Sequence, residues 1–243
     1  MYSEQPLFRP PADDTTLWRY MDFEKFVSLL ERRTLYFARL TSLADPFEGL
    51  PVRRHMEIAR QSPTGLSEQE TTKHKEEIEG YKRSIEEKRK VYFVSCWHMN
   101  RDESYAMWKI YAGAGAGIAI RSRFHRFKAA LPATPLPQVL AGTVNYVDYD
   151  TDQPLRVPYL EELAFSKRRC FDFESEFRGF VRDDETEAPG VEVPVDVNLL
   201  VEQVYVSPTS PVWIRELVQA VLDRYGLKVE AIQSGILTGP SYF

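Results

Sequence analysis

Cysteine is scarce in this chain of 243 residues, where Cys96 and Cys170 are the only two. Two cysteines do not make a disulfide framework or a thiolate zinc site. Long apolar runs are also missing, so the sequence predicts no membrane span. Residues 1–16 lack the apolar stretch of a secretion signal. Together these absences predict a reducing, cytoplasmic setting.

An excess of positive charge is missing as well. The chain has 31 basic and 36 acidic residues, which gives a net charge of −5. This balance argues against a general affinity for nucleic-acid phosphates and leaves room only for a local basic patch. Hydrophobic residues make up 43% and aromatic residues 13%, so the composition predicts a globular protein with an aromatic-rich interior.

The chain shows no internal repeat and no linker typical of a domain boundary. We expect a loose arm over residues 1–16, which are polar and hold three prolines. Residues 17–243 are expected to form a single α+β domain with short mixed or antiparallel strands flanked by helices. Within it, about 51–90 is predicted to be a helical excursion. Residues 67–90 are rich in Glu and Lys, which indicates a solvated helix serving as an exposed excursion or lid, or else a partner-binding arm.

Hydrophobic periodicity places the other elements. Strands are predicted at 17–20, 35–38, 91–97, 118–120, 143–149, 201–206 and 229–233. Helices are predicted to begin near 23 and to cover 103–112, 124–131, 158–169 and 211–225. Residues 183–198 are acidic and proline-rich, which favours a loop. Asp45 and Glu48 fall on a turn after the second strand.

The segment 171–181 carries the clearest chemical signal. If it is one strand, alternation puts Glu174, Glu176 and Arg178 on one face and apolar side chains on the other. Two neighbouring carboxylates repel, so the pair is tolerable where solvent, a cation or a ligand compensates. The pair is therefore the best candidate for chemistry, and the alternative is a solvated face that Arg178 balances.

Several motifs stand in a fixed order along the chain. They are Trp18-Arg19-Tyr20, Leu35-Tyr36-Phe37, Asp45-Pro46-Phe47-Glu48, Ser95-Cys96-Trp97, Met107-Trp108-Lys109-Ile110-Tyr111-Ala112 and Glu174-Ser175-Glu176-Phe177-Arg178. This set resembles the bacterial family catalogued as domain of unknown function 2971, over about residues 17–233. That family name supplies no activity.

A more distant resemblance is to the ADP-ribosyltransferases. One branch has an Arg on the first strand, a Ser-centred strand and a Glu-x-Glu strand, and Arg19, Ser95 and Glu174/Glu176 follow that order. The match departs from that branch at Ser95, because Cys96-Trp97 follows it instead of a small polar pair. Another branch uses a first-strand His and a later Tyr. Tyr20 and Tyr36 are the nearest equivalents here, and none of the four histidines lies on the first strand.

The resemblance implies a split sheet and NAD as the substrate. It also implies a protein or nucleic-acid acceptor, or water, and a role as a toxin or phage-defence effector. Glu176 would stabilise the oxocarbenium-like state at the ribose, and Glu174 would orient the acceptor and take its proton. Arg19 would hold the pyrophosphate. The other residues expected to contact NAD are Tyr20, Tyr36, Ser95, Trp108, Tyr111 and Arg178.

Each of these residues also has a structural interpretation. Arg19 could pair with a surface acid, Ser95 could be a packing residue, and Trp108 and Tyr111 could belong to the core. His98 comes just after the predicted strand, which favours a solvent-facing loop position.

Three functions therefore compete. A transferase or NAD glycohydrolase predicts that Arg19 and Glu176 face one cleft with several aromatics. A Mg²⁺-dependent nuclease or phosphodiesterase predicts that Asp45, Glu48, Glu174 and Glu176 converge on one point. A non-catalytic ligand-binding or sensing domain predicts a structural network, with Arg178 in a buried bidentate salt bridge to Asp45 or Glu48.

Overall fold

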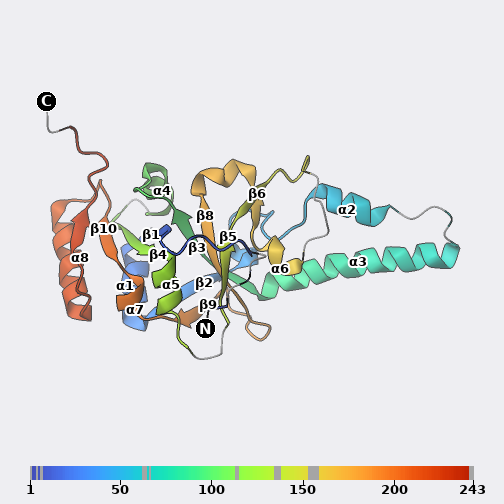
Figure 1. Ribbon diagram of the computed structural model, residues 1–243, viewed down its shortest axis with the longest axis horizontal. Coiled ribbons are helices and arrows are strands. Elements are labelled where there is room, and N and C mark those ends of the chain that lie inside the picture. The colour runs from blue at the N-terminus through green and yellow to red at the C-terminus, as the bar shows by residue number, and fades with distance from the viewer. Residues whose placement is uncertain are drawn as a thin grey trace.

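The structure of the chain is a computed structural model, which describes residues 2–3, 5, 8–61, 65, 67–112, 115–133, 138–152 and 159–240. A mixed sheet flanked by helices forms its body (Figure 1). The prediction of an α+β domain with short mixed or antiparallel strands flanked by helices is confirmed. No helix in the described part of the chain has both the length and the apolar composition needed to cross a bilayer.

The strands are β1 (Thr16–Asp22), β2 (Thr34–Arg39), β3 (Tyr92–Met99), β4 (Gly117–Arg123), β5 (Leu140–Thr143), β6 (Asn145–Val147), β7 (Ser166–Arg168), β8 (Glu176–Arg182), β9 (Gly190–Pro194), β10 (Gln203–Val206) and β11 (Ala231–Gln233). The α-helices are α1 (Phe23–Arg32), α2 (Arg53–Arg60), α3 (Glu68–Val91), α4 (Tyr105–Tyr111), α5 (Phe124–Ala130), α6 (Leu160–Leu163), α7 (Val197–Leu200) and α8 (Val212–Tyr225). Two 3₁₀ turns are η2 (Leu40–Ser42) and η3 (Arg169–Glu174).

Local sequence explains where the helices around the site begin and end. The Asp22 side chain accepts from the Lys25 backbone N–H and so caps α1. Ser104 caps α4 in the same way, through the Met107 N–H. At the end of α8, Gly226 takes a left-handed backbone conformation with φ of 72°, which glycine adopts without steric cost.

The large sheet runs β11-β10-β4-β1-β3-β2-β9, and β8 joins β3 and carries β5. β1 pairs with β3 only through Leu17↔Met99 and Trp18↔His98, after which β1 continues along β4. On the same edge of β3, β2 pairs at Val94 and Phe93. Between these two contacts, residues 95–97 have no strand partner on that edge among the described residues. The sheet therefore forks between β1 and β2.

The two faces of the sheet are covered differently. Residues of α1, α5, α7 and α8 pack with the strands into the main apolar core, which includes Phe26, Phe127 and Leu222. On the opposite face α4 packs over β1, where Trp108 joins Trp18 in a smaller aromatic cluster. The fork in the sheet opens beneath α4.

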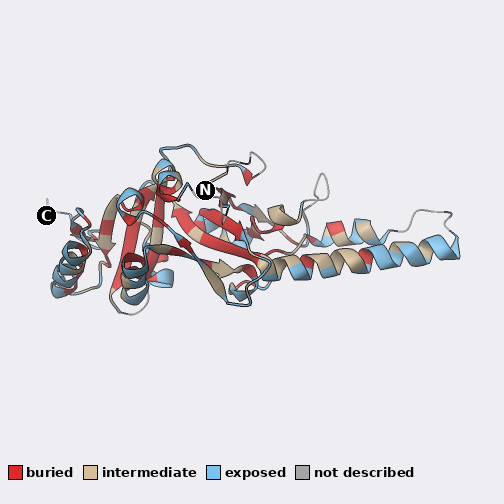
Figure 2. Ribbon diagram, turned by 90° about the horizontal axis from the view of Figure 1, so that it is seen from below, coloured by how far each residue is buried: buried red, intermediate tan, exposed pale blue. Residues whose placement is uncertain are grey.

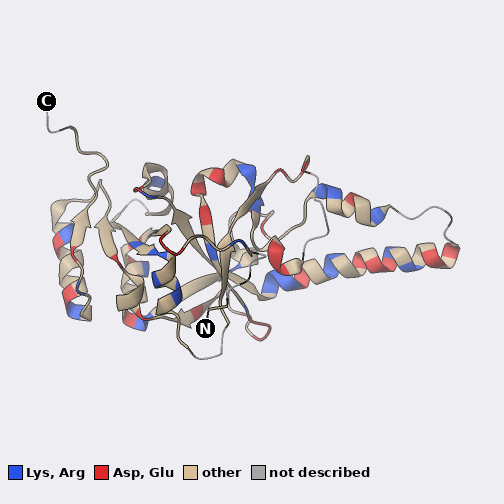
Figure 3. Ribbon diagram, viewed as in Figure 1, with Lys and Arg blue, Asp and Glu red and all other residues tan. Residues whose placement is uncertain are grey.

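The excursion is an α2–α3 hairpin that projects from the body (Figure 1). Only Ile78 and Ile85 are buried along the 24 residues of α3, and exposure increases toward its outer end (Figure 2). Acidic and basic side chains alternate along it (Figure 3), as the Glu- and Lys-rich sequence predicted. Ser67 and Glu70 form a capping box at its start.

Three predicted elements differ from the structure. The strand expected over 171–181 begins only at Glu176, because η3 occupies 169–174 and Ser175 has a φ of 39°. The loop expected over 183–198 contains β9, which extends the sheet beside β2. The helix expected over 158–169 is the short α6 followed by β7, with Pro158 outside the described residues.

The segment expected to be a loose arm contacts the body at the described positions. Phe8 is buried and stacks on Phe165 with 4.6 Å between ring centroids. The backbone N–H of Ser3 donates to the Val139 carbonyl at 2.9 Å.

Candidate functional site

A cleft of about 430 Å³ opens at the fork between β1, β2 and β3. Its charged lining residues are Arg19, Lys25, Asp45, Glu48, Lys167, Glu174, Glu176 and Arg178. Its aromatic lining residues are Trp18, Tyr20, Tyr36, Trp97, His98, Tyr111 and Phe171. The cleft thus brings together side chains from β1, β2, β3, α4, β7, η3 and β8.

Arg19 lies where β1 leaves β3 and reaches across the fork. One Nη donates to Ser95 Oγ at 2.9 Å, and the other donates to the Tyr36 carbonyl at 3.0 Å. The guanidinium also lies 5.6 Å from the centroid of the Trp97 ring. Burial lowers the pKa of Arg19 to about 10, which leaves it cationic at neutral pH. Arg19 is thus a fixed positive charge, held by β2 and β3.

The opposite part of the cleft is a buried ionic network centred on Glu176, which is 2% exposed. Arg178 donates from Nε to Glu176 Oε1 at 2.7 Å and from Nη2 to Oε2 at 3.0 Å. The same guanidinium contacts Glu48, at 3.0 Å from Nη2 and 2.9 Å from Nη1. It also donates to the Ala164 carbonyl. The network therefore ties β8 to the turn after β2.

Lys167 on β7 is the second cation of this network. Its ammonium lies 2.5 Å from Glu174 Oε2 and 3.1 Å from Glu176 Oε2. It is 3.7 Å from Glu48 Oε1. Tyr111 donates its hydroxyl to Glu174 Oε1 at 2.8 Å. Lys167 thus compensates the repulsion between the two glutamates that the sequence placed side by side.

The network keeps Glu176 ionised. Burial alone would raise its pKa, but the positive charge and hydrogen bonds of Arg178, with the charge of Lys167, hold the pKa at about 2. Burial alone would likewise lower the pKa of Lys167, and Glu176 and Glu48 instead raise it above its usual range. For Tyr111, burial and the nearby Glu174 both raise the pKa, so its hydroxyl remains a donor.

Of the remaining predicted site residues, two line the cleft, and Ser95 and Trp108 do not. Tyr20 and Tyr36 line the cleft, and Tyr36 is 45% exposed. Ser95 is buried and contacts the guanidinium of Arg19, as well as accepting from Trp97 Nε1 at 3.2 Å. Trp108 packs edge-on against Tyr20 inside the small cluster, with 5.0 Å between ring centroids, and does not line the cleft.

Asp45 faces a different partner from the glutamates. It makes an ion pair with Arg168 at 2.9 Å and accepts from the Phe47 backbone N–H. In the parts of the chain that the structure describes, no group of three or more His, Cys, Asp or Glu residues is arranged to hold a metal ion. The glutamates converge on Lys167 and Arg178, so the arrangement that the nuclease hypothesis required does not appear there.

Sequence reasoning missed Lys167 and His98. Lys167 falls in the predicted helix 158–169. Its contact with Glu176 has no sequence signal, because a Lys nine residues before a Glu is not a distinctive pattern. His98 was expected in an exposed loop, and this is wrong, because His98 lies on β3 and is 3% exposed. The predicted strand ends two residues before β3 does, and extending the alternation from Val94 and Cys96 places His98 on the cleft face.

Comparisons with known proteins do not assign this chain to a family. No family model matches the chain, so the predicted membership of the domain of unknown function 2971 stays a prediction. No curated protein matches it either. Among solved structures, it is similar to "Thermus sp. 2.9 DarT in complex with ADP-ribosylated ssDNA", at 13% identity and a TM-score of 0.41. The alignment covers 93% of this chain and 97% of that one. A likeness at this level transfers neither activity nor residue roles.

Proposed function

We propose that this chain is an NAD-consuming enzyme of the ADP-ribosyltransferase type. It would break the bond between nicotinamide and ribose and pass ADP-ribose to a protein or nucleic-acid acceptor, or to water. The main support is that Arg19 and the pair Glu174 and Glu176 line one cleft with several aromatics. This is the arrangement that the transferase hypothesis required.

The shape and charge of the cleft fit a dinucleotide. Arg19 and Lys25 supply positive charge suited to a pyrophosphate. A second hollow, of about 440 Å³, shares Arg19, Tyr20, Lys25 and Tyr36 with the cleft. A pyrophosphate at Arg19 would therefore have space for one nucleoside on either side.

The acidic part of the cleft suits the bond cleavage. Nicotinamide would leave with the electron pair of its bond to ribose, which creates positive charge at the ribose carbon. The ionised Glu176 would stabilise that charge without moving, because Arg178 and Lys167 already hold it. Glu174 accepts one hydrogen bond at each oxygen from Tyr111 and Lys167, and would take the proton of the attacking acceptor.

The test is to incubate the purified protein with NAD and follow free nicotinamide. Release should require Arg19, Glu174 and Glu176, so Arg19→Gln, Glu174→Gln and Glu176→Gln should abolish it. Arg215→Gln on the exposed face of α8 is the matched control and should leave release unchanged. Absence of both nicotinamide release and calorimetric NAD binding by the folded wild type would refute the proposal.

A second candidate is a non-catalytic NAD-binding domain. The buried ion pairs of Arg178 with Glu176 and Glu48 favour it, because such contacts can keep these motif residues for the stability of the fold alone. One experimental result distinguishes the enzyme from the non-catalytic domain. NAD binding without nicotinamide release, with water, single-stranded DNA or a cell lysate as acceptor, would support the domain and exclude the enzyme.

The proposal includes a role as a toxin or phage-defence effector. In that case, expression of the wild-type chain in bacteria should slow growth, and equal expression of Arg19→Gln should not. Equal growth inhibition by both chains would show that any toxicity does not depend on the chemistry of the cleft.

A further inference from the structure

His98 occupies a central place in the cleft that the proposed chemistry does not use. It lies on β3 opposite Trp18 of β1 and Glu176 of β8. Its ring lines the cleft together with Val94 and Cys96, which share its face of β3. The ring centroid of Tyr20 is 6.3 Å away.

The hydrogen bond at Nδ1 fixes the tautomer of this ring. Nδ1 lies 2.5 Å from the backbone carbonyl oxygen of Glu174, and a carbonyl can only accept. The proton is therefore on Nδ1, and Nε2 of the neutral ring carries a lone pair. Burial lowers the pKa of His98, which favours this neutral form.

Nε2 has no partner among the described residues, and it is buried. A buried acceptor without a donor is unfavourable, so such atoms are usually satisfied by another group. Trp18, Tyr20 and Met107 also line the cleft, and such a lining suits a flat, largely apolar ring. An aromatic ring that carries an N–H donor would complement both this lining and the lone pair of Nε2.

We infer that His98 Nε2 accepts a hydrogen bond from the carboxamide N–H of nicotinamide, and so selects NAD over its nicotinic acid analogue. This inference rests on the proposed function. The ribose hydroxyls are donors too, but the carboxylates Glu174 and Glu176 are the stronger acceptors for them. The carboxylate of nicotinic acid offers no N–H, and its negative charge would meet the lone pair of Nε2.

Two substitutions test the roles of Nδ1 and Nε2 separately. The amide of His98→Asn can reach the position of Nδ1 and still donate to Glu174, but it has nothing at Nε2. His98→Gln places its amide near Nε2 and loses the contact at Nδ1. The wild type should bind NAD more tightly than nicotinic acid adenine dinucleotide by roughly tenfold, and His98→Asn should lose that preference. His98→Gln should retain part of it.

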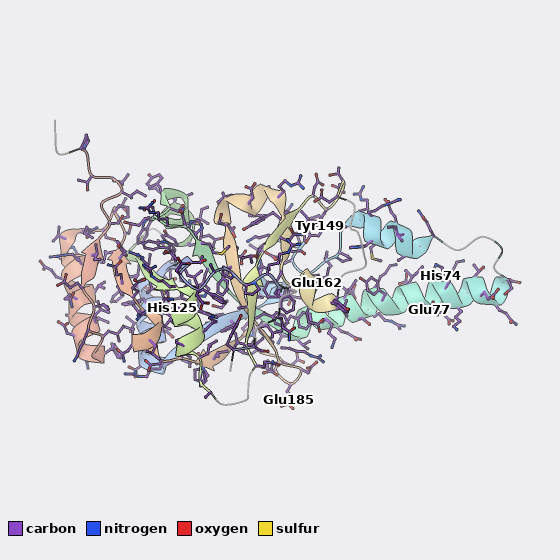
Figure 4. All side chains as sticks on the ribbon, viewed as in Figure 1. His74, Glu77, His125, Tyr149, Glu162 and Glu185 are labelled. Carbon is purple, nitrogen blue, oxygen red and sulfur yellow. The ribbon has the colours of Figure 1, made fainter. Side chains whose placement is uncertain are left out.

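NMR of the His98 ring in the wild-type protein tests the inference without relying on the folding of the variants. The chain has four histidines. Figure 4 shows His74 on α3 and His125 on α5, and neither residue lines the cleft. The ¹⁵N resonance of His98 Nε2 should start at the value of an unprotonated nitrogen and move toward that of a hydrogen-bonded one on addition of NAD.

The outcomes are distinct. A shift of the His98 resonance with NAD, together with loss of the preference in His98→Asn, supports the inference. NAD binding with an unmoved resonance, or with the preference intact in His98→Asn, overturns the inference and leaves the proposed function standing. If the wild type binds no NAD at all, both fail together.

Discussion

Arg178 holds Glu176 at two points, with Nε 2.7 Å from Oε1 and Nη2 3.0 Å from Oε2. The two residues lie on one face of β8, and Arg178 is 0% exposed. Its remaining contacts, with Glu48 and the Ala164 carbonyl, join β8 to the turn after β2 and to the end of α6. The guanidinium therefore stabilises the fold of the site as well as the charge of Glu176.

Arg178→Met should destabilise the protein strongly, because the buried carboxylates of Glu48 and Glu176 each lose their bidentate partner and keep only Lys167. Removing one member of a buried ion pair costs roughly 3–5 kcal/mol, measurable by urea denaturation. Arg182→Met is the matched control, since Arg182 lies on the same strand in a solvent-exposed pair with Asp184. Its cost should be at most about 1 kcal/mol. Equal costs would show that the buried network is not stabilising.

Lys167→Met should make stability strongly pH-dependent. Without the ammonium, the Glu174 carboxylate keeps the hydrogen bond from Tyr111 but loses its cation, while Glu48 and Glu176 share the charge of Arg178 in a buried site. Protonation of a carboxylate relieves this repulsion, so the variant should be far less stable than the wild type at pH 8 and closer to it at pH 5. Thermal unfolding at both pH values measures the difference. A constant difference would contradict this account.

Glu176 should contribute to the acid sensitivity of the fold. Its pKa in the folded chain is about 2, below the reference value of 4.5, so the unfolded chain binds more protons between these values. The stabilisation by Glu176 is then complete above pH about 4.5 and lost as pH falls toward 2. Glu176→Gln should flatten the stability curve over that interval, in denaturation experiments at each pH. The exposed Glu185→Gln should not (Figure 4).

The sequence predicted much of the fold because its strongest signals are local. Alternation located β3 and the part of 171–181 that holds Glu176 and Arg178. The helical stripe located α8. The predicted strand begins too early because Ser175 adopts a left-handed backbone conformation. Serine rarely adopts this conformation, so the residue type does not predict it. Glu174 reaches the network from η3 as a result, and not from the strand.

The partners in the site could not be predicted in the same way. The contact of Lys167 with Glu176 depends on β7 lying beside the start of β8, and no periodicity encodes that proximity. The fork that exposes Arg19 arises from two short strand pairings on one edge of β3. Both depend on tertiary packing and not on local periodicity, so the residue types were identifiable from the sequence and their geometry was not.

Tyr111 and Trp108 lie one helical turn apart on α4, and no sequence pattern distinguishes which of them belongs to the core and which to the site. The structure separates them: Tyr111 is 41% exposed and donates to Glu174, whereas Trp108 is 3% exposed and packs on Tyr20. Tyr111→Phe should therefore weaken NAD turnover severalfold with little change in stability, because Glu174 loses one of its two orienting hydrogen bonds. Trp108→Phe should lower the unfolding temperature and leave the KM for NAD nearly unchanged. Nicotinamide-release kinetics and thermal unfolding on both variants measure these effects, and the reverse pattern would place Trp108 in the site and Tyr111 outside it.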